Sequence, residues 1–214
     1  MNGTDTQQRR VRHQPIGRKD MTNSGGGLSI CVFCGASPGD SPAYTQAGYE
    51  LGERLAAGDH RLVYGAGGIG IMGAVARGAA DNNGRIAGII PEFLRERERN
   101  HDIPPQEVVI TDDLARRKSI MMDLADAFVC LPGGYGTLNE LLEVMSMNVM
   151  GIEDRPLVLV NTQGFWDSFI NLVDGFAGRR FIPEEKHFTV VGSPVEAIEH
   201  IEATAGSRLA ATME

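Results

Sequence analysis

The sequence has no apolar run long enough to cross a membrane, and acidic residues outnumber basic ones, giving a net charge of −8. A membrane-spanning helix needs about 20 consecutive apolar residues, and nucleic-acid-binding domains typically carry a broad basic surface. We therefore expect neither a membrane nor a nucleic acid among its partners. The 214 residues, 42% of them hydrophobic, suit one globular domain with a substantial core.

Cysteine is scarce, and the three residues present are Cys31, Cys34 and Cys130. All lie in apolar segments, which is typical of buried thiols in a reducing cytosol, so we expect a cytoplasmic protein. Cys31 and Cys34 have the spacing of a redox pair, which keeps a redox function open. Alternation along a strand, however, directs these two side chains to opposite faces. Since no second pair of Cys or His residues follows, we predict no metal site.

The first 27 residues are polar and basic and end in three consecutive glycines. They lack the apolar core of a signal peptide, and their composition is typical of disordered segments. An organelle-targeting role is the alternative to a simple tail. We predict a disordered tail over residues 1–27, a catalytic domain over 28–204 and a C-terminal tail over 205–214.

Strand-like and helix-like patterns alternate along the rest of the chain. The predicted strands are 28–34, 61–64, 86–90, 108–110, 128–131, 157–160 and 188–191. The predicted helices are 42–57, a segment ending near 82–84, 112–125, a segment beginning at Thr137, 165–176 and 194–201. Alternation with continuously apolar strands is typical of a parallel sheet covered on both faces. We therefore predict an α/β fold, a Rossmann-like doubly wound parallel sheet in a single domain.

Three loops rich in glycine, serine or threonine each follow a predicted strand: CGASPGDSP, YGAGGIGIMG and PGGYGT. Ligands of parallel sheets bind at the carboxyl ends of the strands, where glycine permits close approach and helix N-termini attract anions. Any one of these loops is equally compatible with a tight turn, but three at one edge favour a phosphorylated nucleotide. The candidate phosphate-binding residues are Ser37, Gly67, Gly133, Gly134, Gly136 and Thr137.

Neither common nucleotide-cofactor motif is complete. The segment from Gly65 to Gly70 nearly matches the dinucleotide fingerprint, but it follows the second strand, and no acidic residue ends a strand about 20 residues later. A Walker motif is absent because no Gly-Lys-Ser or Gly-Lys-Thr occurs. We therefore predict no bound cofactor.

The predicted helix 112–125 carries two cations on its apolar side. Arg117 and Lys118 share a stripe with Met121 at helical spacing. Such cations either extend to the edge of the core or are held at a buried anionic ligand, and the pattern leaves both interpretations open.

The predicted helix from Thr137 is partly apolar on two sides. Opposite its main apolar stripe lie Glu140, Glu143, Val144, Met147 and Met150. A helix that is apolar on two sides is buried twice, and we expect another subunit to provide the second cover, as a dimer or a multiple of dimers. Glu140 lies one turn into the helix, close to any ligand at its start, although carboxylates there are also ordinary partners of the helix dipole.

Two motifs resemble those of the LONELY GUY family. PGGYGTLNE, residues 132–140, resembles the family signature PGGxGTxxE, and LARRK, residues 114–118, resembles its Arg-Lys segment. The resemblance extends over about residues 30–201. It implies a Rossmann-like fold and a cytokinin riboside 5'-monophosphate phosphoribohydrolase, which cleaves an N-glycosidic bond and releases the free base and ribose 5-phosphate. Members often carry a lysine decarboxylase label, but no Ser-X-His-Lys-type segment for a pyridoxal Schiff base occurs.

The same resemblance implies roles for individual residues. Arg117 and Glu140 would be the catalytic pair, and Lys118, Met121 and Glu143 would join the loop residues in binding a nucleoside 5'-monophosphate. A homodimer is also implied. The alternative is a non-catalytic protein of the molybdenum cofactor carrier type, because that fold also carries nucleotide-like cofactors. Three positions depart from the family pattern, which puts substrate preference in doubt more than the reaction: Ala36, Ala66 and Asn139, the last often acidic in relatives.

Overall fold

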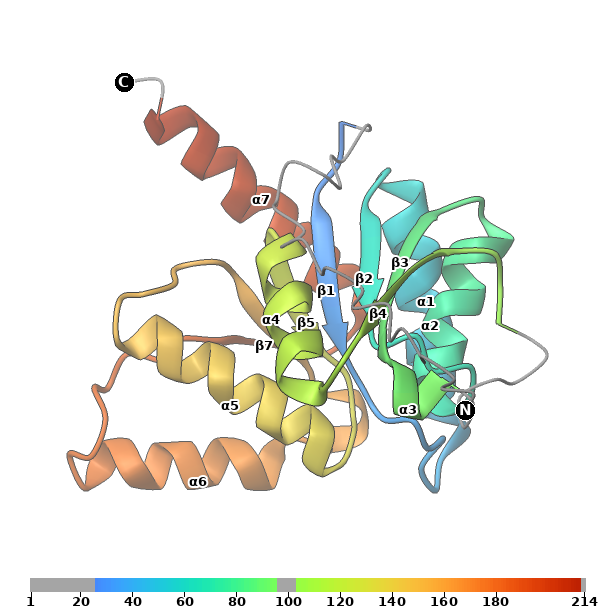
Figure 1. The fold of residues 1–214 in the computed structure, drawn as a ribbon. Coiled ribbons are helices and arrows are strands. Elements are labelled where there is room, and N and C mark those ends of the chain that lie inside the picture. Colours follow the sequence, from blue (N-terminus) through green and yellow to red (C-terminus); the bar gives the residue numbers. More distant parts are fainter. Residues whose placement is uncertain (1–25, 96–102, 213–214) are drawn as a thin grey trace, which may run out of the picture.

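A computed structural model describes residues 26–95 and 103–212 of the chain. In this part, seven parallel strands form one sheet in the order β4-β3-β2-β1-β5-β6-β7 (Figure 1). The strands are β1 (Ser29–Phe33), β2 (Arg61–Tyr64), β3 (Arg85–Pro91), β4 (Glu107–Thr111), β5 (Ala127–Cys130), β6 (Leu157–Val160) and β7 (Thr189–Val191). The predicted α/β fold with a parallel sheet is confirmed.

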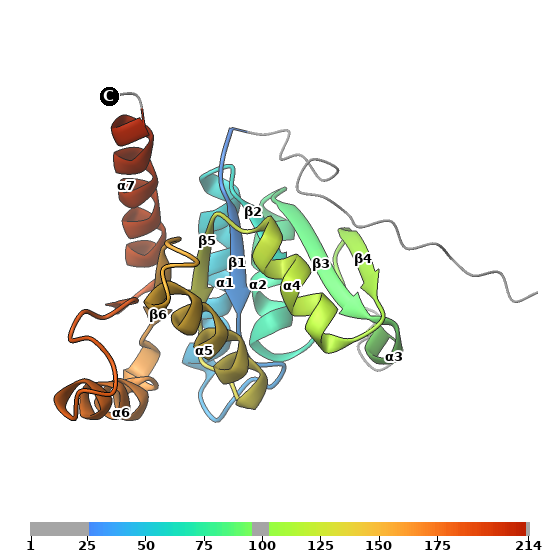
Figure 2. The same cartoon turned by 60° about the vertical axis from the view of Figure 1, so that its left-hand side comes forward.

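Helices cover both faces of the sheet. Figures 1 and 2 show α1 and α2 on one face and α4 and α5 on the other. The helices are α1 (Pro42–Ala57), α2 (Gly70–Asp81), α3 (Glu92–Arg95), α4 (Leu114–Leu124), α5 (Tyr135–Val149), α6 (Asp167–Gly178) and α7 (Pro194–Thr212), with a 3-10 turn, η1, at Thr162–Gly164.

Alternate side chains of the central strand enter separate cores. Ile30 and Val32 of β1 pack with α1, α2 and α7, whereas Cys31 and Phe33 pack with α4, α5 and α6. Cys34 lies in the first of these two cores, so Cys31 and Cys34 are separated by the sheet, and both are free thiols. This arrangement does not support the redox alternative.

Most predicted elements agree with the structure, and the differences lie at the ends. Helix α7 continues to Thr212, so the predicted C-terminal tail is helical as far as that residue. The short helix α3 was not expected. The predicted tail 1–27 and the charged segment after Arg95 lie almost wholly outside the described residues. None of the helices in the described ranges combines the length and apolarity that a bilayer crossing requires.

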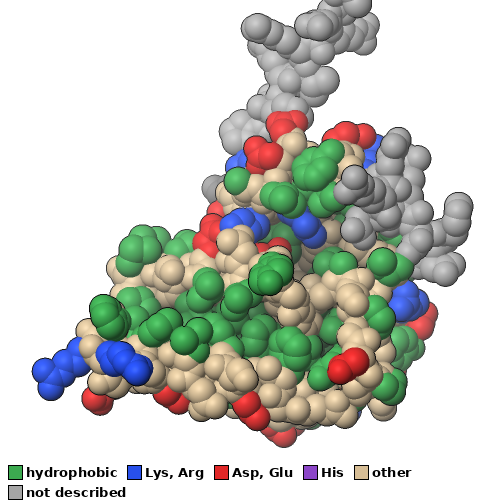
Figure 3. Space-filling view, turned by 90° about the horizontal axis from the view of Figure 1, so that it is seen from below, with side chains coloured by type: hydrophobic (Ala, Val, Ile, Leu, Met, Phe, Trp, Pro, Cys, Tyr) green, Lys and Arg blue, Asp and Glu red, His purple; other side chains and the backbone are tan. Residues whose placement is uncertain are grey.

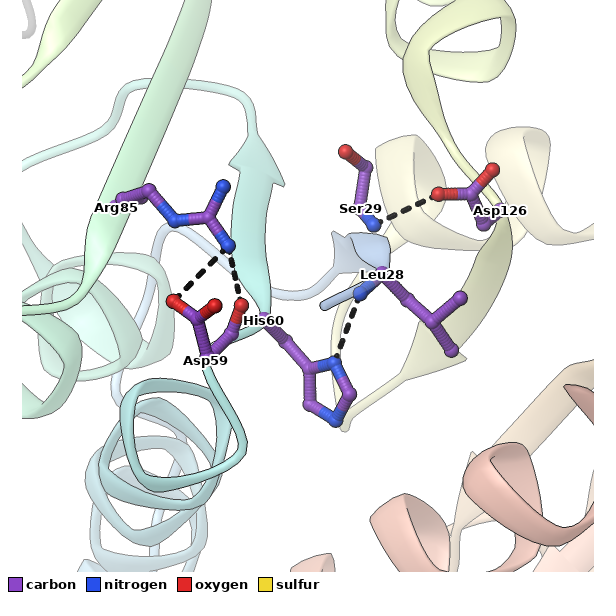
Figure 4. A network of polar contacts seen from close by, with 6 residues as sticks. All are labelled: Leu28, Ser29, Asp59, His60, Arg85 and Asp126. Carbon is purple, nitrogen blue, oxygen red and sulfur yellow. Dashed lines mark hydrogen bonds and ion pairs between the residues drawn. The ribbon is translucent and has the colours of Figure 1, made fainter. Parts of the chain in front are cut away.

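Polar contacts link the amino-terminal ends of the strands, at the edge of the sheet opposite the three glycine-rich loops (Figure 4). The Leu28 N–H donates to His60 Nδ1 at 3.1 Å, and the Ser29 N–H donates to Asp126 Oδ2 at 2.8 Å. Arg85 donates to the backbone carbonyl and the side chain of Asp59. Because these groups lie at the starts of four strands, β1, β2, β3 and β5, we assign this edge a structural role.

Candidate active site

A cavity of about 630 Å³ opens at the carboxyl edge of the sheet, the side of the molecule seen in Figure 3. Its walls come from the segments that follow β1, β2, β5 and β6, together with residues of α1, α2, α3, α4 and α5. The position agrees with the general rule for parallel sheets, in which ligands bind where the strand order reverses. Here that point lies between β1 and β5, and the loops that follow both strands line the cavity.

The loops after β1 and β5 touch through their backbones. The Gly35 N–H donates to the Pro132 carbonyl at 3.0 Å. A Cβ on Gly133 would lie 2.1 Å from Thr137 Oγ1 and 2.9 Å from the Gly35 nitrogen. Glycine is therefore required at position 133 by the close approach of its neighbours.

The start of α5 presents an open, uncapped end to the cavity. Gly134 is the N-cap residue, and no side chain caps the first turn. A Cβ on Gly134 or Gly136 would meet nothing within 4 Å, so protein packing does not require glycine at either position. Free N–H groups and the positive end of the helix dipole make such an end a binding site for an anion. The open space beside these two glycines is suited to the close approach of a phosphate.

Arg117 points into the site from α4. Its Nε donates to the Ile89 carbonyl at 3.1 Å and its Nη2 donates to the Gly65 carbonyl at 2.8 Å, so the guanidinium bridges the ends of β3 and β2. A Cβ on Gly65 would lie only 1.6 Å from Nη2. Glycine at position 65 therefore makes room for Arg117. Of the two interpretations left open by the sequence, the structure favours a cation held at the cavity.

Glu140 lines the cavity from the second turn of α5. Its carboxyl group makes no hydrogen bond or ion pair with the residues that the structure describes. Burial raises the pKa of Glu140 to about 7, against the opposing effects of Arg117 and Lys118. A carboxyl group that titrates near neutral pH is suited to acid–base chemistry.

Cys34 also lines the cavity but is not suited to nucleophilic catalysis. Burial, and next the charge of Glu140, raise the pKa of the Cys34 thiol above its ordinary value. Reactive cysteines need the thiolate, which this surrounding disfavours. We therefore assign Cys34 to the wall of the site.

The structure brings together most of the candidates from the sequence. Seven of them line the cavity: Ser37, Arg117, Gly133, Gly134, Gly136, Thr137 and Glu140. Met121 does not line it, because this side chain is 1% exposed and packs in the core under α4. Gly67 is buried in the loop before α2, outside the lining.

Lys118 and Glu143 also lie outside the lining. Lys118 Nζ donates to Asn139 Oδ1 at 2.7 Å and forms an ion pair with Glu143 Oε2. Both side chains are thus engaged with each other across the contact between α4 and α5.

Two aromatic side chains of the site were missed by the sequence interpretation. Tyr44 of α1 and Phe165, which follows η1, both line the cavity, and their ring centroids lie 5.8 Å apart. A turn with positive φ at Gln163 and Gly164 presents Phe165, whose ring also rests on Trp166. The rule that directs attention to the carboxyl ends of strands would have found Phe165, because it follows β6. Tyr44 gave no such signal, since it shares the apolar stripe of its helix.

The described residues contain no group of three or more His, Cys, Asp and Glu side chains that could hold a metal ion.

Comparison with known proteins places the chain in a family. The sequence model of a family described as "Possible lysine decarboxylase" matches residues 72–201. The cytokinin riboside 5'-monophosphate phosphoribohydrolase LOG of Oryza sativa subsp. japonica is 40% identical over 165 residues, which cover 77% of this chain and 68% of that protein. The chain belongs to the LONELY GUY (LOG) family.

Further comparisons agree with LOG membership. The enzyme of the same name designated LOG1 of Arabidopsis thaliana is 39% identical over 165 residues, which cover 77% of each chain. Among solved structures, the Moco carrier protein of Chlamydomonas reinhardtii has a TM-score of 0.64 over 85% of this chain and 99% of that one. Its sequence identity is 19%, so this likeness concerns the fold alone.

Proposed function

We propose that this LOG-family protein hydrolyses the N-glycosidic bond of cytokinin riboside 5'-monophosphates, with AMP as a further substrate, and releases the free base and ribose 5-phosphate. The names of the LOG relatives support this substrate class. The observation that carries the proposal is the meeting of three features in one cavity: the uncapped start of α5, the anchored Arg117, and Glu140 with its raised pKa.

The geometry suggests how the reaction proceeds. The first-turn N–H groups of α5 bind the 5'-phosphate, which brings the ribose toward Glu140 one turn later. Breakage of the bond between ribose and base leaves the bonding electrons on the base and positive charge on the ribose. Ionised Glu140 stabilises that charge and orients the attacking water, which adds its oxygen to the anomeric carbon. That water passes one proton to Glu140 as its oxygen bonds to the anomeric carbon, and the departing base takes up one proton, so that one water is consumed overall.

Arg117 supplies a fixed positive charge to this site. Because Nε and Nη2 are engaged by backbone carbonyls, the guanidinium is held in one orientation. Its Nη1 group is left to donate to the substrate. A preorganised cation of this kind stabilises developing negative charge on a phosphate or a leaving base.

A lysine decarboxylase activity is not supported by the cavity. Such an enzyme needs a lysine to hold pyridoxal phosphate as a Schiff base. No lysine occurs among the cavity residues of the described chain, and Lys118 is engaged with Asn139 and Glu143.

The reaction is tested by incubating the purified protein with isopentenyladenosine 5'-monophosphate and with AMP, and by separating the free bases chromatographically. We expect free base from at least one nucleotide. Molybdenum cofactor, offered in a parallel incubation, tests the carrier alternative. Tight binding of that cofactor with no release of base from either nucleotide would overturn the proposed reaction.

We expect the protein to use nucleotides far better than nucleosides. Adenosine lacks the phosphate that the N-terminus of α5 would bind, so binding energy no longer supports the chemical step. The value of kcat/KM should fall roughly a hundredfold or more, the scale on which preorganised N–H donors contribute. The measurement is the release of adenine from AMP and from adenosine under identical conditions, and equal rates would contradict a phosphate site at α5.

We also propose a homo-oligomer, a dimer or a multiple of dimers, in the cytoplasm. The three buried free thiols support the location. Apolar side chains gather on the face shown in Figure 3. Large apolar side chains are also exposed on α5, at its C-cap, on α6 and in the segment after α6, and they support a subunit contact: Leu142, Val149, Met150, Leu172, Phe176 and Phe181.

The sequence-based choice of contact residues needs correction. Val144 is 1% exposed and packs in the same core as Trp166 and Val173, and Met147 packs against that core. Part of the second side of α5 is thus covered inside one chain, and the more exposed apolar side chains around it are left for a partner.

Leu172→Asp should weaken assembly. Aspartate at this position removes apolar area that the proposed subunit contact would bury, which is worth about 1.5–3 kcal/mol per protomer. It also adds like-charge repulsion across a twofold axis. Light scattering gives the molar mass, and activity is measured on the same fractions. Leu114→Asp is the matched control, because Leu114 is similarly exposed but lies at the start of α4. A monomeric wild type with full activity would show that the apolar face has another role.

A further inference from the structure

We propose that Lys118 and Glu143 form a charge-balanced clamp that positions Glu140 and sets its charge state without touching the substrate; this rests on the proposed function of Glu140. The resemblance to LOG enzymes implied that both residues bind substrate. In the structure neither lines the cavity, and each is the other's partner. Their place beside Glu140 therefore calls for a different role.

The clamp joins α4 to α5, and its two contacts on α5 lie before and after Glu140 in the sequence. Lys118 reaches from α4 to α5, where its Nζ donates to Asn139, the residue before Glu140, and pairs with Glu143, less than one turn after it. Both contacts on α5 are made by the same ammonium group. The turn of α5 that carries Glu140 is thereby fixed against α4.

Two neighbouring residues of α4, Arg117 and Lys118, contact different parts of the fold. Arg117 turns toward the strand ends and is anchored on the Gly65 and Ile89 carbonyls, whereas Lys118 turns toward α5. The charge of Arg117 therefore faces the cavity, and the charge of Lys118 is neutralised locally by Glu143. The side chain at position 139 adds no charge, because it is an asparagine.

Glu140 consequently lies near two positive charges and one negative charge. Arg117 and Lys118 from α4 lower its pKa, Glu143 raises it, and burial outweighs both, which gives a value of about 7. Burial raises the pKa of the three buried thiols, and the charge of Glu140 adds to that effect: Cys31, Cys34 and Cys130. The clamp thus holds two opposing charges whose separate removal has opposite effects on Glu140.

The signs follow directly. The value of kcat/KM should rise with pH as Glu140 ionises, and this part of the pH profile is its rising limb. Lys118→Met removes a positive charge and leaves Glu143 unpaired, so the pKa of Glu140 rises and the rising limb moves to higher pH. Glu143→Gln removes a negative charge and leaves Lys118 unpaired, so the same limb moves to lower pH. Each shift should be about one pH unit, which is at the lower end of the effect of a close charge. In the double variant Lys118→Met/Glu143→Gln the two effects offset each other, and the limb returns close to its wild-type position.

The first measurement is the pH profile of kcat/KM for AMP in the wild type, both single variants and the double variant, each checked for folding by thermal unfolding. Asn139→Asp adds a fifth profile, in which a new negative charge moves the limb to higher pH while Lys118 remains in place. Opposite shifts in the single variants and a return in the double variant are expected. Shifts of the same sign, or an unmoved limb with a raised KM, would show that these residues are structural or contact the substrate, and would overturn the proposal.

The second measurement does not depend on catalysis. The protein without substrate is labelled with carbon-13 at the glutamate carboxyl groups and titrated by NMR, with Glu140→Gln used to assign the signal. The same opposite shifts are expected in this titration. If the wild type hydrolyses no nucleotide, the proposed reaction fails but the clamp is still tested by these spectra. If the Glu140 signal titrates identically in all variants, the clamp is wrong whatever the enzyme does.

Discussion

Glu140→Gln should reduce turnover of AMP roughly a hundredfold or more while leaving nucleotide binding nearly intact. The amide keeps the size of the side chain but loses the negative charge that opposes the developing charge on the ribose. Binding depends on the loops and the start of α5, which this substitution does not touch. Single-turnover rates and nucleotide dissociation constants, measured on the same preparation, separate the two effects.

The same substitution should stabilise the fold, and this sets Glu140 apart from a structural residue. Its pKa is raised from the ordinary 4.5 to about 7, so the folded state binds a proton more tightly than the unfolded state. An acid shifted in this direction makes the free energy of unfolding fall as pH rises from about 4.5 to about 7. Ionised Glu140 thus costs the fold up to about 3 kcal/mol above pH 7. Glutamine removes that cost.

Thermal unfolding at pH 8 and pH 4 tests this linkage. The variant should unfold at a higher temperature than the wild type at pH 8, and the difference should shrink at pH 4, where Glu140 is protonated in both states. A variant that loses activity and stability together would show that Glu140 holds the structure. Substantial turnover in folded Glu140→Gln protein would remove it from the catalytic role.

The sheet, the glycine loop and the main charged residues of the site could be predicted from the sequence, because they depend on local patterns. Continuous apolar strands determine a parallel sheet, and the ends of such strands determine where a ligand binds. The glycine loop 133–137 and the two charged residues Arg117 and Glu140 could therefore be expected at one edge from spacing and motif. The structure places all of them on one cavity.

The rest of the site depends on packing between helices, which no local pattern encodes. The ion pair of Lys118 with Glu143 joins positions 25 residues apart, and only the approach of α4 to α5 creates it. The burial of Val144 depends on cover from the region of α6. Met121 has the spacing of a site residue, but the rotation of α4 directs it into the core. Spacing identifies a face of a helix, whereas contact with other elements decides what that face does.

Gly65→Ala should be nearly as damaging as loss of Arg117 itself, although alanine adds only one methyl group. That methyl carbon would lie 1.6 Å from Arg117 Nη2, so the guanidinium has to leave its position on the Gly65 carbonyl. We expect kcat/KM for AMP to fall roughly a hundredfold or more, the scale of losing one preorganised electrostatic group. Gly178→Ala is the matched control, because a Cβ there meets nothing within 4 Å and the residue lies at the end of α6, away from the cavity.

A double-variant cycle shows whether the effect of Gly65→Ala acts through Arg117. Arg117→Ala should reduce kcat/KM on the same scale, and it removes the side chain with which the new methyl group collides. Residues that act through one interaction give effects that do not add. In the Arg117→Ala background, Gly65→Ala should therefore change kcat/KM by less than about twofold, and thermal unfolding should show both variants to be folded. If the two losses multiply instead, Gly65 contributes to the site independently, through its own carbonyl or the shape of its loop, and the anchoring of Arg117 at the ends of β2 and β3 is not what makes glycine necessary there.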